Sequence, residues 1–124
     1  MPLYTISTRA GVLSGEAKAK LAGALTTFHS DYASVPKEWV QIIFHDYGPG
    51  SGFSGGEPSA AAALTLLIRS GRSADYKRAM LKRLWALLQE ATGAPDNQIL
   101  IGIQEAPASQ AMEMGQIVPE VGDQ

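Results

Sequence analysis

The sequence contains no cysteine and no apolar run that approaches the roughly 20 residues of a membrane-spanning helix. The absence of cysteine excludes disulfide bonds, a thiol nucleophile and a thiolate metal site. The N-terminus also lacks the basic segment followed by an apolar segment that marks a secretory signal peptide. We therefore expect a cytoplasmic protein that does not associate with a membrane.

The sequence also lacks a strong excess of charge of either sign, because its formal net charge is −2 and its pI is near 5.6. This balance gives no general electrostatic reason to expect a nucleic-acid partner. Positive charge is concentrated at six positions: Arg69, Arg72, Lys77, Arg78, Lys82 and Arg83. Most of these side chains are expected to form a solvated helix face. Hydrophobic residues make up 45% of the 124-residue chain, which fits one small globular domain over residues 1–124.

What the sequence does contain is an internal repeat. When Ser14 is aligned with Ser73, residues of similar type fall at corresponding positions of the two halves for about thirty residues. The repeats span about residues 2–46 and 62–105. A segment rich in Gly, Pro and Ser connects them over residues 47–60, and no Gly-Lys-Ser/Thr sequence closes it as in a phosphate-binding loop. We interpret this segment as the connection between the halves, with room for a short hairpin at an assembly contact.

Each half has the pattern of a strand, a helix and a second strand. Apolar or β-branched runs are typical of strands, and runs with an apolar stripe behind a serine N-cap are typical of helices. The predicted strands lie at 3–8, 40–44, 64–69 and 99–103, and the predicted helices at 14–32 and 73–92. Two such β-α-β units predict an α+β fold with a four-stranded mixed sheet and both helices on one face, because the crossovers are right-handed. The other face would be bare, which predicts an oligomer.

Pro2 stands directly behind the initiator methionine and leads into the first predicted strand. Methionine before a small residue is usually removed, and Pro2 would then carry a terminal secondary amine. Burial lowers the pKa of such an amine from its reference value of about 7.7–8.0, so that it exchanges a proton near neutral pH. Taken alone, a Met-Pro start is better explained as a common and stable N-terminus.

Arg69 and Arg72 lie in one tight turn between a predicted strand and the Ser73 helix cap. Two guanidinium groups beside a helix N-terminus are suited to bind a carboxylate. The alternative is that each arginine pairs with a surface acid, as most arginines do. The sequence favours neither interpretation strongly over the other.

Two histidines and one acid complete the candidates. His29 lies at the edge of the apolar stripe near the end of the first helix, where a packed or capping role is the more common one. His45 ends a predicted strand without an identifiable partner. Glu113 follows the last strand between Met112 and Met114, and in a pocket with apolar walls supplied by these methionines it could act as a base or activate water.

The doubled β-α-β unit, the proline after the initiator methionine and the arginine pair resemble the tautomerase superfamily, and within it the cis-3-chloroacrylic acid dehalogenase group. The likeness extends along nearly the whole chain. It is most specific in four segments: "FHSDY" (28–32), "GPGSGFSGG" (48–56), "RSGRSAD" (69–75) and "EAPASQAMEMG" (105–115). The resemblance implies a subunit that forms a homotrimer, binds a small carboxylate and uses an amino-terminal proline without a cofactor or a metal.

The resemblance also implies a role for each candidate. Pro2 looks like the catalytic proline that acts as a general acid or base. Arg69 and Arg72 fall on the pair that binds the substrate carboxylate, and His29 on the histidine that helps to hold it. Glu113 matches the acid that activates water in the dehalogenases.

One position departs from the pattern of the dehalogenases. They have a tyrosine in the last strand of the sheet, where this chain has Gly102. Glycine has no side chain that could assist the glutamate and the water, and the sequence does not place Tyr4 or Tyr47 at the site as a replacement. This departure favours tautomerase or hydratase activity over efficient dehalogenation.

We therefore expect a cofactor-independent enzyme of isomerase, hydro-lyase or hydrolase type that acts on a small unsaturated or 2-oxo carboxylate. Its activity would be tautomerisation or the hydration of a cis-3-haloacrylate. Decarboxylation of malonate semialdehyde is an alternative, since the same arginine pair would serve it. A trimeric binding module without turnover is another. A nucleic-acid binder would need one continuous basic patch, and none is expected.

Overall fold

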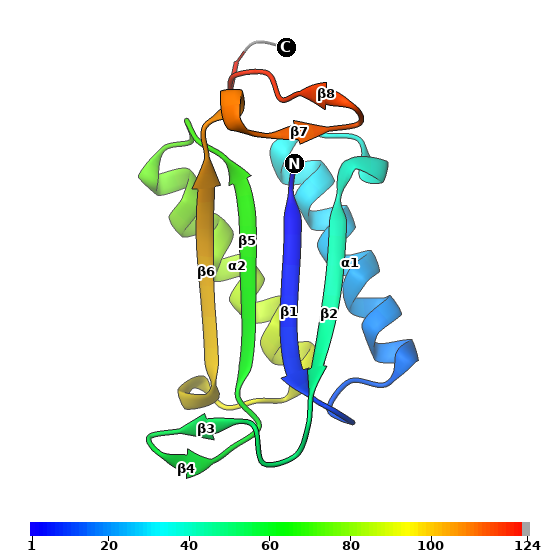
Figure 1. Ribbon diagram of the computed structural model, residues 1–124, viewed down its shortest axis with the longest axis vertical. Coiled ribbons are helices and arrows are strands. Elements are labelled where there is room, and N and C mark those ends of the chain that lie inside the picture. The colour runs from blue at the N-terminus through cyan, green and yellow to red at the C-terminus, as the bar shows by residue number, and fades with distance from the viewer. Residues whose placement is uncertain (123–124) are drawn as a thin grey trace.

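The computed structural model describes residues 1–122 and has the predicted α+β architecture (Figure 1). The first β-α-β unit consists of β1 (Leu3–Arg9), α1 (Gly15–Ala33) and β2 (Gln41–Tyr47). The second consists of β5 (Ala62–Arg69), α2 (Ala74–Thr92) and β6 (Ile99–Ala106). The predicted order of strand, helix and strand in each half is therefore confirmed.

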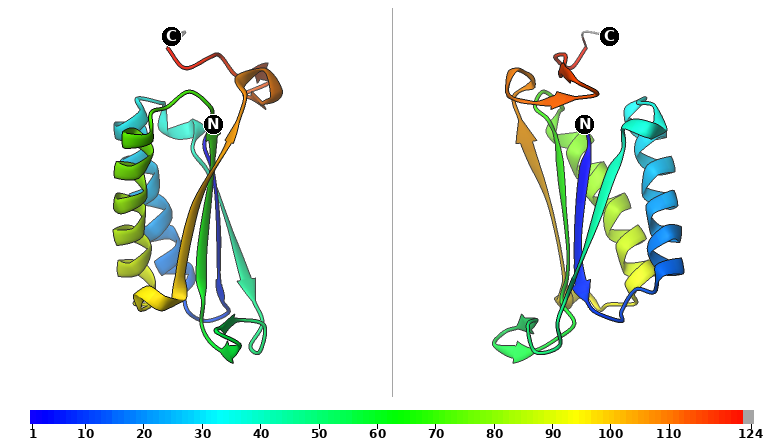
Figure 2. Two further views of the ribbon diagram at one scale, coloured as in Figure 1. Left: turned by 90° about the vertical axis from the view of Figure 1, so that its left-hand side faces the viewer. Right: turned by 45° about the vertical axis from the view of Figure 1, so that its right-hand side comes forward.

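The four long strands form one mixed sheet in the order β2-β1-β5-β6. Strands are parallel within each unit, and the central pair β1 and β5 is antiparallel, with Leu3 opposite Leu67. Both helices cover the same face of the sheet (Figure 2). Because β1 and β5 run in opposite directions, the start of the chain lies beside the end of β5. Neither helix in the part of the chain that the structure describes is long and apolar enough to cross a membrane.

Short elements close the two ends of the sheet. The connection between the units contains a hairpin of β3 (Phe53–Ser54) and β4 (Glu57–Pro58), and 3₁₀ turns precede β2 and β6 at Lys37–Trp39 and Asp96–Gln98. After β6, a third 3₁₀ turn (Ala108–Gln110) leads into a hairpin of β7 (Met112–Glu113) and β8 (Gln116–Ile117). Figure 1 shows this second hairpin lying across the end of the sheet at which the chain begins.

Both helices begin at the predicted serines. The Ser14 hydroxyl accepts a hydrogen bond from the Ala17 N–H at 3.1 Å, and the Ser73 hydroxyl accepts one from the Tyr76 N–H at 3.0 Å. Each cap satisfies a backbone donor that has no partner within the helix. The cap of α2 also fixes the turn that carries Arg69 and Arg72.

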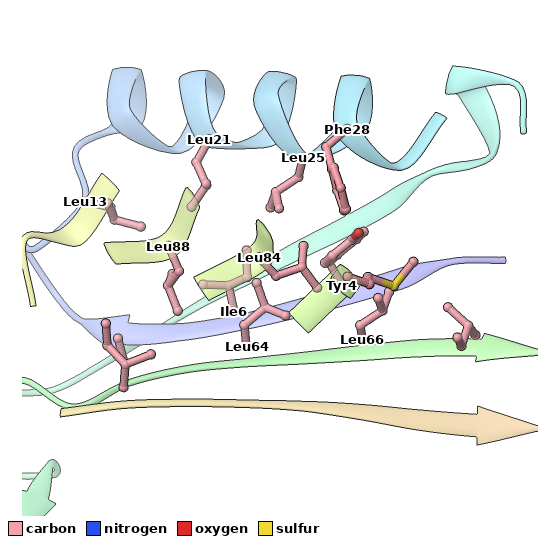
Figure 3. Close-up of a cluster of buried hydrophobic side chains, with 14 residues drawn as sticks. Tyr4, Ile6, Leu13, Leu21, Leu25, Phe28, Leu64, Leu66, Leu84 and Leu88 are labelled. Atoms are coloured by element: carbon pink, nitrogen blue, oxygen red, sulfur yellow. The ribbon is translucent and has the colours of Figure 1, made fainter. Parts of the chain in front are cut away.

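The hydrophobic core lies between the helices and the covered face of the sheet (Figure 3). Side chains alternate along a strand, so every second residue of β1 and β5 faces this layer. The fully buried members of the sheet are Tyr4, Ile6, Leu64 and Leu66, and those of the helices are Leu25, Met80, Leu84 and Leu88. Full burial of one large aliphatic side chain contributes about 1.5–3 kcal/mol to stability.

Within residues 1–122, the opposite face of the sheet carries no helix (Figure 2). Two large aliphatic side chains on it, Ile43 in β2 and Leu100 in β6, are 50% and 74% exposed. The expectation of a face without helices is confirmed.

Candidate active site

A pocket of about 300 Å³ lies at the end of the sheet where the chain begins. Four of the five residues to which the family resemblance assigns a role line it: His29, Arg69, Arg72 and Glu113. They come from the end of α1, the end of β5, the turn before α2, and β7. The antiparallel pairing of β1 with β5 brings these elements and the chain's terminal amine to the same end of the sheet.

The terminal amine of the chain lies inside this pocket. The Met1 amine forms an ion pair with the Glu113 carboxylate. Burial, followed by the positive charge of Arg69, lowers the pKa of this amine from 8.0 to about 6. Pro2 follows as a fully buried residue whose carbonyl accepts a hydrogen bond from the Gln41 N–H at 3.1 Å. With Met1 in place, Met1 and not Pro2 lines the pocket.

Arg69 is held at the base of the pocket. Its side chain is only 9% exposed, and its Nη1 donates to the carbonyl oxygens of Pro119 at 2.6 Å and Glu120 at 3.2 Å. The C-terminal segment thus folds back over the turn after β5. Gly71 in this turn has a φ of +119°, and a Cβ there would lie 3.1 Å from the Cβ of Val121. Glycine is therefore required both by the backbone conformation and by the space beneath this segment.

Arg72 lies on the other side of the turn and packs over an aromatic ring. Its guanidinium carbon is 4.9 Å from the centroid of the Tyr76 ring, which is a cation–π geometry. Tyr76 lines the pocket, and its carbonyl accepts a hydrogen bond from the Tyr32 hydroxyl at 2.8 Å. Burial raises the pKa of Tyr76 while the charge of Arg72 opposes that rise, so Tyr76 stays a neutral phenol near pH 7.

His29 is buried beneath the pocket and contacts Tyr4. Its Nδ1 lies 2.7 Å from the Tyr4 hydroxyl, and the two groups share a hydrogen bond. Burial, then the terminal amine, then Arg72 lower the pKa of His29 from 6.5 to about 4. His29 is therefore neutral at pH 7. Burial also raises the pKa of Tyr4 well above its usual value, so the phenol keeps its proton.

The apolar walls of the pocket differ from the prediction. Met112 and Met114 are 63% and 51% exposed and do not line it. Met112 points away because strand neighbours alternate, and Met114 occupies the turn of the β7–β8 hairpin with a φ of 52°. The walls come instead from five residues in the segment after α1, in β5 and in α2: Val35, Pro36, Trp39, Ile68 and Met80.

Tyr4 and Tyr47, which were considered as replacements for the last-strand tyrosine of the dehalogenases, do not line the pocket. Tyr4 lies behind His29, and the Tyr47 hydroxyl donates to the Ala61 carbonyl at 2.6 Å at the opposite end of the sheet. Gly102 sits in β6 opposite Thr65, and a Cβ at this position would have no neighbouring atom of the described chain within 4 Å. The phenol that does line the pocket is Tyr76, and its only signal in the sequence is its place four residues after Arg72.

The pocket combines the positive charge of Arg69 and Arg72 with the Glu113 carboxylate and the terminal amine. Two guanidinium groups near the N-terminus of α2 favour an anionic ligand, and the low-pKa amine and the Glu113 carboxylate can exchange protons with it. In the described part of the chain, residues 1–122, no group of three or more His, Asp or Glu side chains could hold a metal ion. His45 is exposed on β2 and does not line the pocket.

Comparison with known proteins places this geometry in a family. The family described as "putative oxalocrotonate tautomerase enzyme" matches residues 1–124. The search of curated proteins gave no match.

Two crystal structures are 32% identical to this chain. One is native Ps01740, with a TM-score of 0.85 over 90% of this chain and 99% of that chain. The other is N1, a member of the cis-3-chloroacrylic acid dehalogenase family, with a TM-score of 0.88 over 97% of this chain and 85% of that chain. The symmetric trimer of wild-type fused 4-OT is 19% identical, has a TM-score of 0.83 and covers 94% of both chains, and it supports the fold alone. The chain therefore belongs to the tautomerase superfamily, in the family of putative oxalocrotonate tautomerases, and has a relative in the cis-3-chloroacrylic acid dehalogenase family.

Proposed function

We propose that this chain is a cofactor-independent enzyme whose terminal Pro2 amine, after removal of Met1, acts as a general acid or base on a small unsaturated or 2-oxo carboxylate. One observation carries the proposal. The terminal amine at the start of β1 lies in the same pocket as four polar side chains: His29, Arg69, Arg72 and Glu113.

Removal of Met1 would move the terminal amine by one residue, to Pro2 at the start of β1. The hydrogen bond between the Pro2 carbonyl and the Gln41 N–H anchors this residue to the sheet. The surroundings that lower the pKa of the Met1 amine to about 6 are burial and the charge of Arg69. We expect them to lower the pKa of the Pro2 amine as well, so that both of its protonation states are populated near neutral pH.

Arg69 and Arg72 would bind the substrate carboxylate from their common turn. Fixing the carboxylate orients the reacting carbons and lowers the entropic part of the barrier. The same positive charge stabilises an enolate as it forms, because the site is partly shielded from water. His29 would contact an oxygen of the bound substrate from the side of α1.

Tautomerisation of an enol then needs only one proton carrier. The neutral Pro2 nitrogen accepts the proton of the enol O–H, and the enolate electrons form the carbonyl. The resulting ammonium group delivers a proton to the carbon next to the carbonyl. The product is the 2-oxo acid, and the Pro2 amine returns to its neutral form.

Hydration of a cis-3-haloacrylate is a second candidate, because Glu113 lies beside the terminal amine. Glu113 would take a proton from water while the water oxygen bonds to C3 and a protonated Pro2 supplies the proton at C2. The halohydrin formed in this way then loses halide and a proton to give the aldehyde. The 32% identity to N1 supports this candidate. No tyrosine of β6 is available to assist it, so we place tautomerisation first.

We also propose that the protein is a homotrimer. The uncovered face of the sheet carries exposed Ile43 and Leu100, and a second copy would remove this apolar surface from water. The fused 4-OT subunit, which has the same fold, forms the kind of symmetric trimer that we propose here. Light scattering should give three times the 13.1 kDa mass of the chain.

The test of the proposed activity uses two probes and untagged protein. Ketonisation of the enol of phenylpyruvate is followed by ultraviolet absorbance, and cis-3-chloroacrylate is followed by proton NMR. Wild-type protein should accelerate the first reaction, and Pro2→Ala should lose that acceleration. Intact mass spectrometry must show that Met1 is absent, because an acylated Pro2 nitrogen cannot act as a base. A chain that keeps Met1 and shows no turnover would favour a binding module. A Pro2→Ala variant with full activity would refute the role of the Pro2 amine.

A further inference from the structure

The Tyr4 hydroxyl is buried against the one histidine of the pocket. Tyr4 is 0% exposed and His29 is 2% exposed, and their rings meet edge to face with centroids 5.5 Å apart. Figure 3 shows Tyr4 in the core, close to Phe28 and Leu84. Within residues 1–122 the Tyr4 hydroxyl makes one hydrogen bond, to Nδ1 of His29 at 2.7 Å.

This single hydrogen bond decides which nitrogen of His29 carries the proton. A neutral imidazole has one N–H donor and one acceptor nitrogen. If Nδ1 donated to the Tyr4 oxygen, the phenolic O–H would be buried without an acceptor in the described chain, which costs about 1–3 kcal/mol. If Tyr4 donates to Nδ1, both buried groups are satisfied. The proton of His29 must then be on Nε2.

A doubly protonated His29 is disfavoured by the groups around it. Arg69 at the end of β5 and Arg72 before α2 are positively charged, the terminal amine before β1 adds positive charge in its protonated form, and Glu113 on β7 pairs with that amine. Tyr4 and Tyr76 are neutral phenols. The pKa of about 4 agrees with this geometry, so the neutral ring is the relevant one near pH 7.

We propose that Tyr4 is a positioning residue that holds His29 in the Nε2–H tautomer, so that His29 presents a neutral hydrogen-bond donor to an oxygen of the substrate. A neutral donor binds an acceptor oxygen without offering a second acid that competes with Pro2 for the proton transfer. It also selects against ligands that place a donor at this position. The substrate part of this proposal rests on the proposed function, whereas the tautomer does not.

The tautomer can be read directly by NMR of ¹⁵N-labelled protein without any substrate. A ring nitrogen that lacks a proton resonates far downfield of one that carries it, and the chain has only two histidines. The variant His45→Gln leaves His29 as the sole source of signals. At pH 7 we expect Nε2 of His29 to be protonated and Nδ1 to be unprotonated. Protonation at Nδ1, or at both nitrogens, would overturn the proposal.

The variant Tyr4→Phe keeps the ring in the core and removes only the donor. The Nδ1 signal of His29 should move because part of the population now carries its proton there. The kcat/KM for the enol should fall by about 3- to 10-fold, the loss of one hydrogen bond. Tyr47→Phe is the matched control, since it removes a phenol that donates to the Ala61 carbonyl at the other end of the sheet. Tyr47→Phe should change neither the Nδ1 signal of His29 nor the kcat/KM for the enol.

A Tyr4→Phe protein with reduced kcat/KM but unchanged His29 signals would show that Tyr4 acts only through packing, and the proposal would fail. If the variant does not fold, the wild-type spectrum still decides the tautomer. Wild-type protein without any turnover would reject the proposed function and leave the result for Tyr4 and His29 standing.

Discussion

Replacing Arg69 and Arg72 separately by alanine should separate substrate binding from folding stability, because the two side chains have different partners. Arg69 is 9% exposed and donates to the carbonyls of Pro119 and Glu120. Hydrogen bonds that involve a charged group contribute about 1.5–3 kcal/mol each. One of these two hydrogen bonds is long, and water can bind both carbonyl oxygens once the Arg69 side chain is removed. Arg69→Ala should therefore lower the free energy of unfolding by about 2–4 kcal/mol.

Arg72 is half-buried, and its guanidinium packs on the Tyr76 ring. A partly exposed cation–π contact contributes about 0.5–1 kcal/mol, so Arg72→Ala should be almost as stable as the wild type. Both variants should lose about 100-fold in kcat/KM, since each removes a charged donor from the carboxylate or the developing enolate. Arg78→Ala is the control, because Arg78 pairs with the exposed Asp75 on the outer face of α2.

Urea unfolding followed by tryptophan fluorescence gives the free energies, and ketonisation of the phenylpyruvate enol gives kcat/KM. Equal loss of stability in the Arg69 and Arg72 variants would refute the assignment of their contacts. Full activity in either variant, with Arg78→Ala unchanged, would refute the carboxylate site.

Four further predictions concern pH, packing and assembly. The pKa of His29 is lower in the folded chain, at about 4, than its ordinary value of 6.5, so the unfolded state binds a proton first as pH falls. The free energy of unfolding should therefore drop by about 3 kcal/mol between about pH 6.5 and about pH 4. In urea titrations, His29→Phe should lose this part of the pH dependence and His45→Gln should keep it. The kcat/KM for the enol should fall as pH drops and the Pro2 amine becomes protonated, because a protonated amine cannot accept a proton, and a flat rate profile would contradict this. Leu84→Ala in the core should lower the free energy of unfolding by about 2–5 kcal/mol, whereas Leu100→Asp on the bare sheet face should reduce the mass in light scattering to that of one chain.

The fold could be predicted because its signals are local and repeated. Ser14 and Ser73 are each followed by an acid in the first turn and by an apolar stripe, and both cap a helix. Strand residues such as Tyr4 and Ile6 alternate with polar neighbours, which fixes the face that enters the core. Such patterns need no knowledge of distant contacts.

The site could be predicted less completely, because its walls depend on tertiary contacts. The roles of Pro2, His29, Arg69, Arg72 and Glu113 stay predictions, although the last four and the terminal amine line one pocket. No pattern in the sequence places Trp39 there, since it lies in a 3₁₀ turn that only the folded chain brings against α1 and into the pocket. The assignment of apolar walls to Met112 and Met114 was wrong because hairpin geometry turns both outward.

The internal repeat explains why the two ends of the sheet differ in chemistry although they are built alike. The alignment of Ser14 with Ser73 pairs His29 with Leu88, Arg72 with Leu13 and Tyr76 with Ala17. Leu88 and Leu13 are 0% and 3% exposed and belong to the hydrophobic core. At the pocket end of the sheet, the second unit supplies Arg72 and the first unit supplies His29. The equivalent residues at the other end, Leu13 and Leu88, are apolar and close the core instead. The chain's terminus is present only at the start of β1, so a site that requires a terminal amine can be built at one end alone.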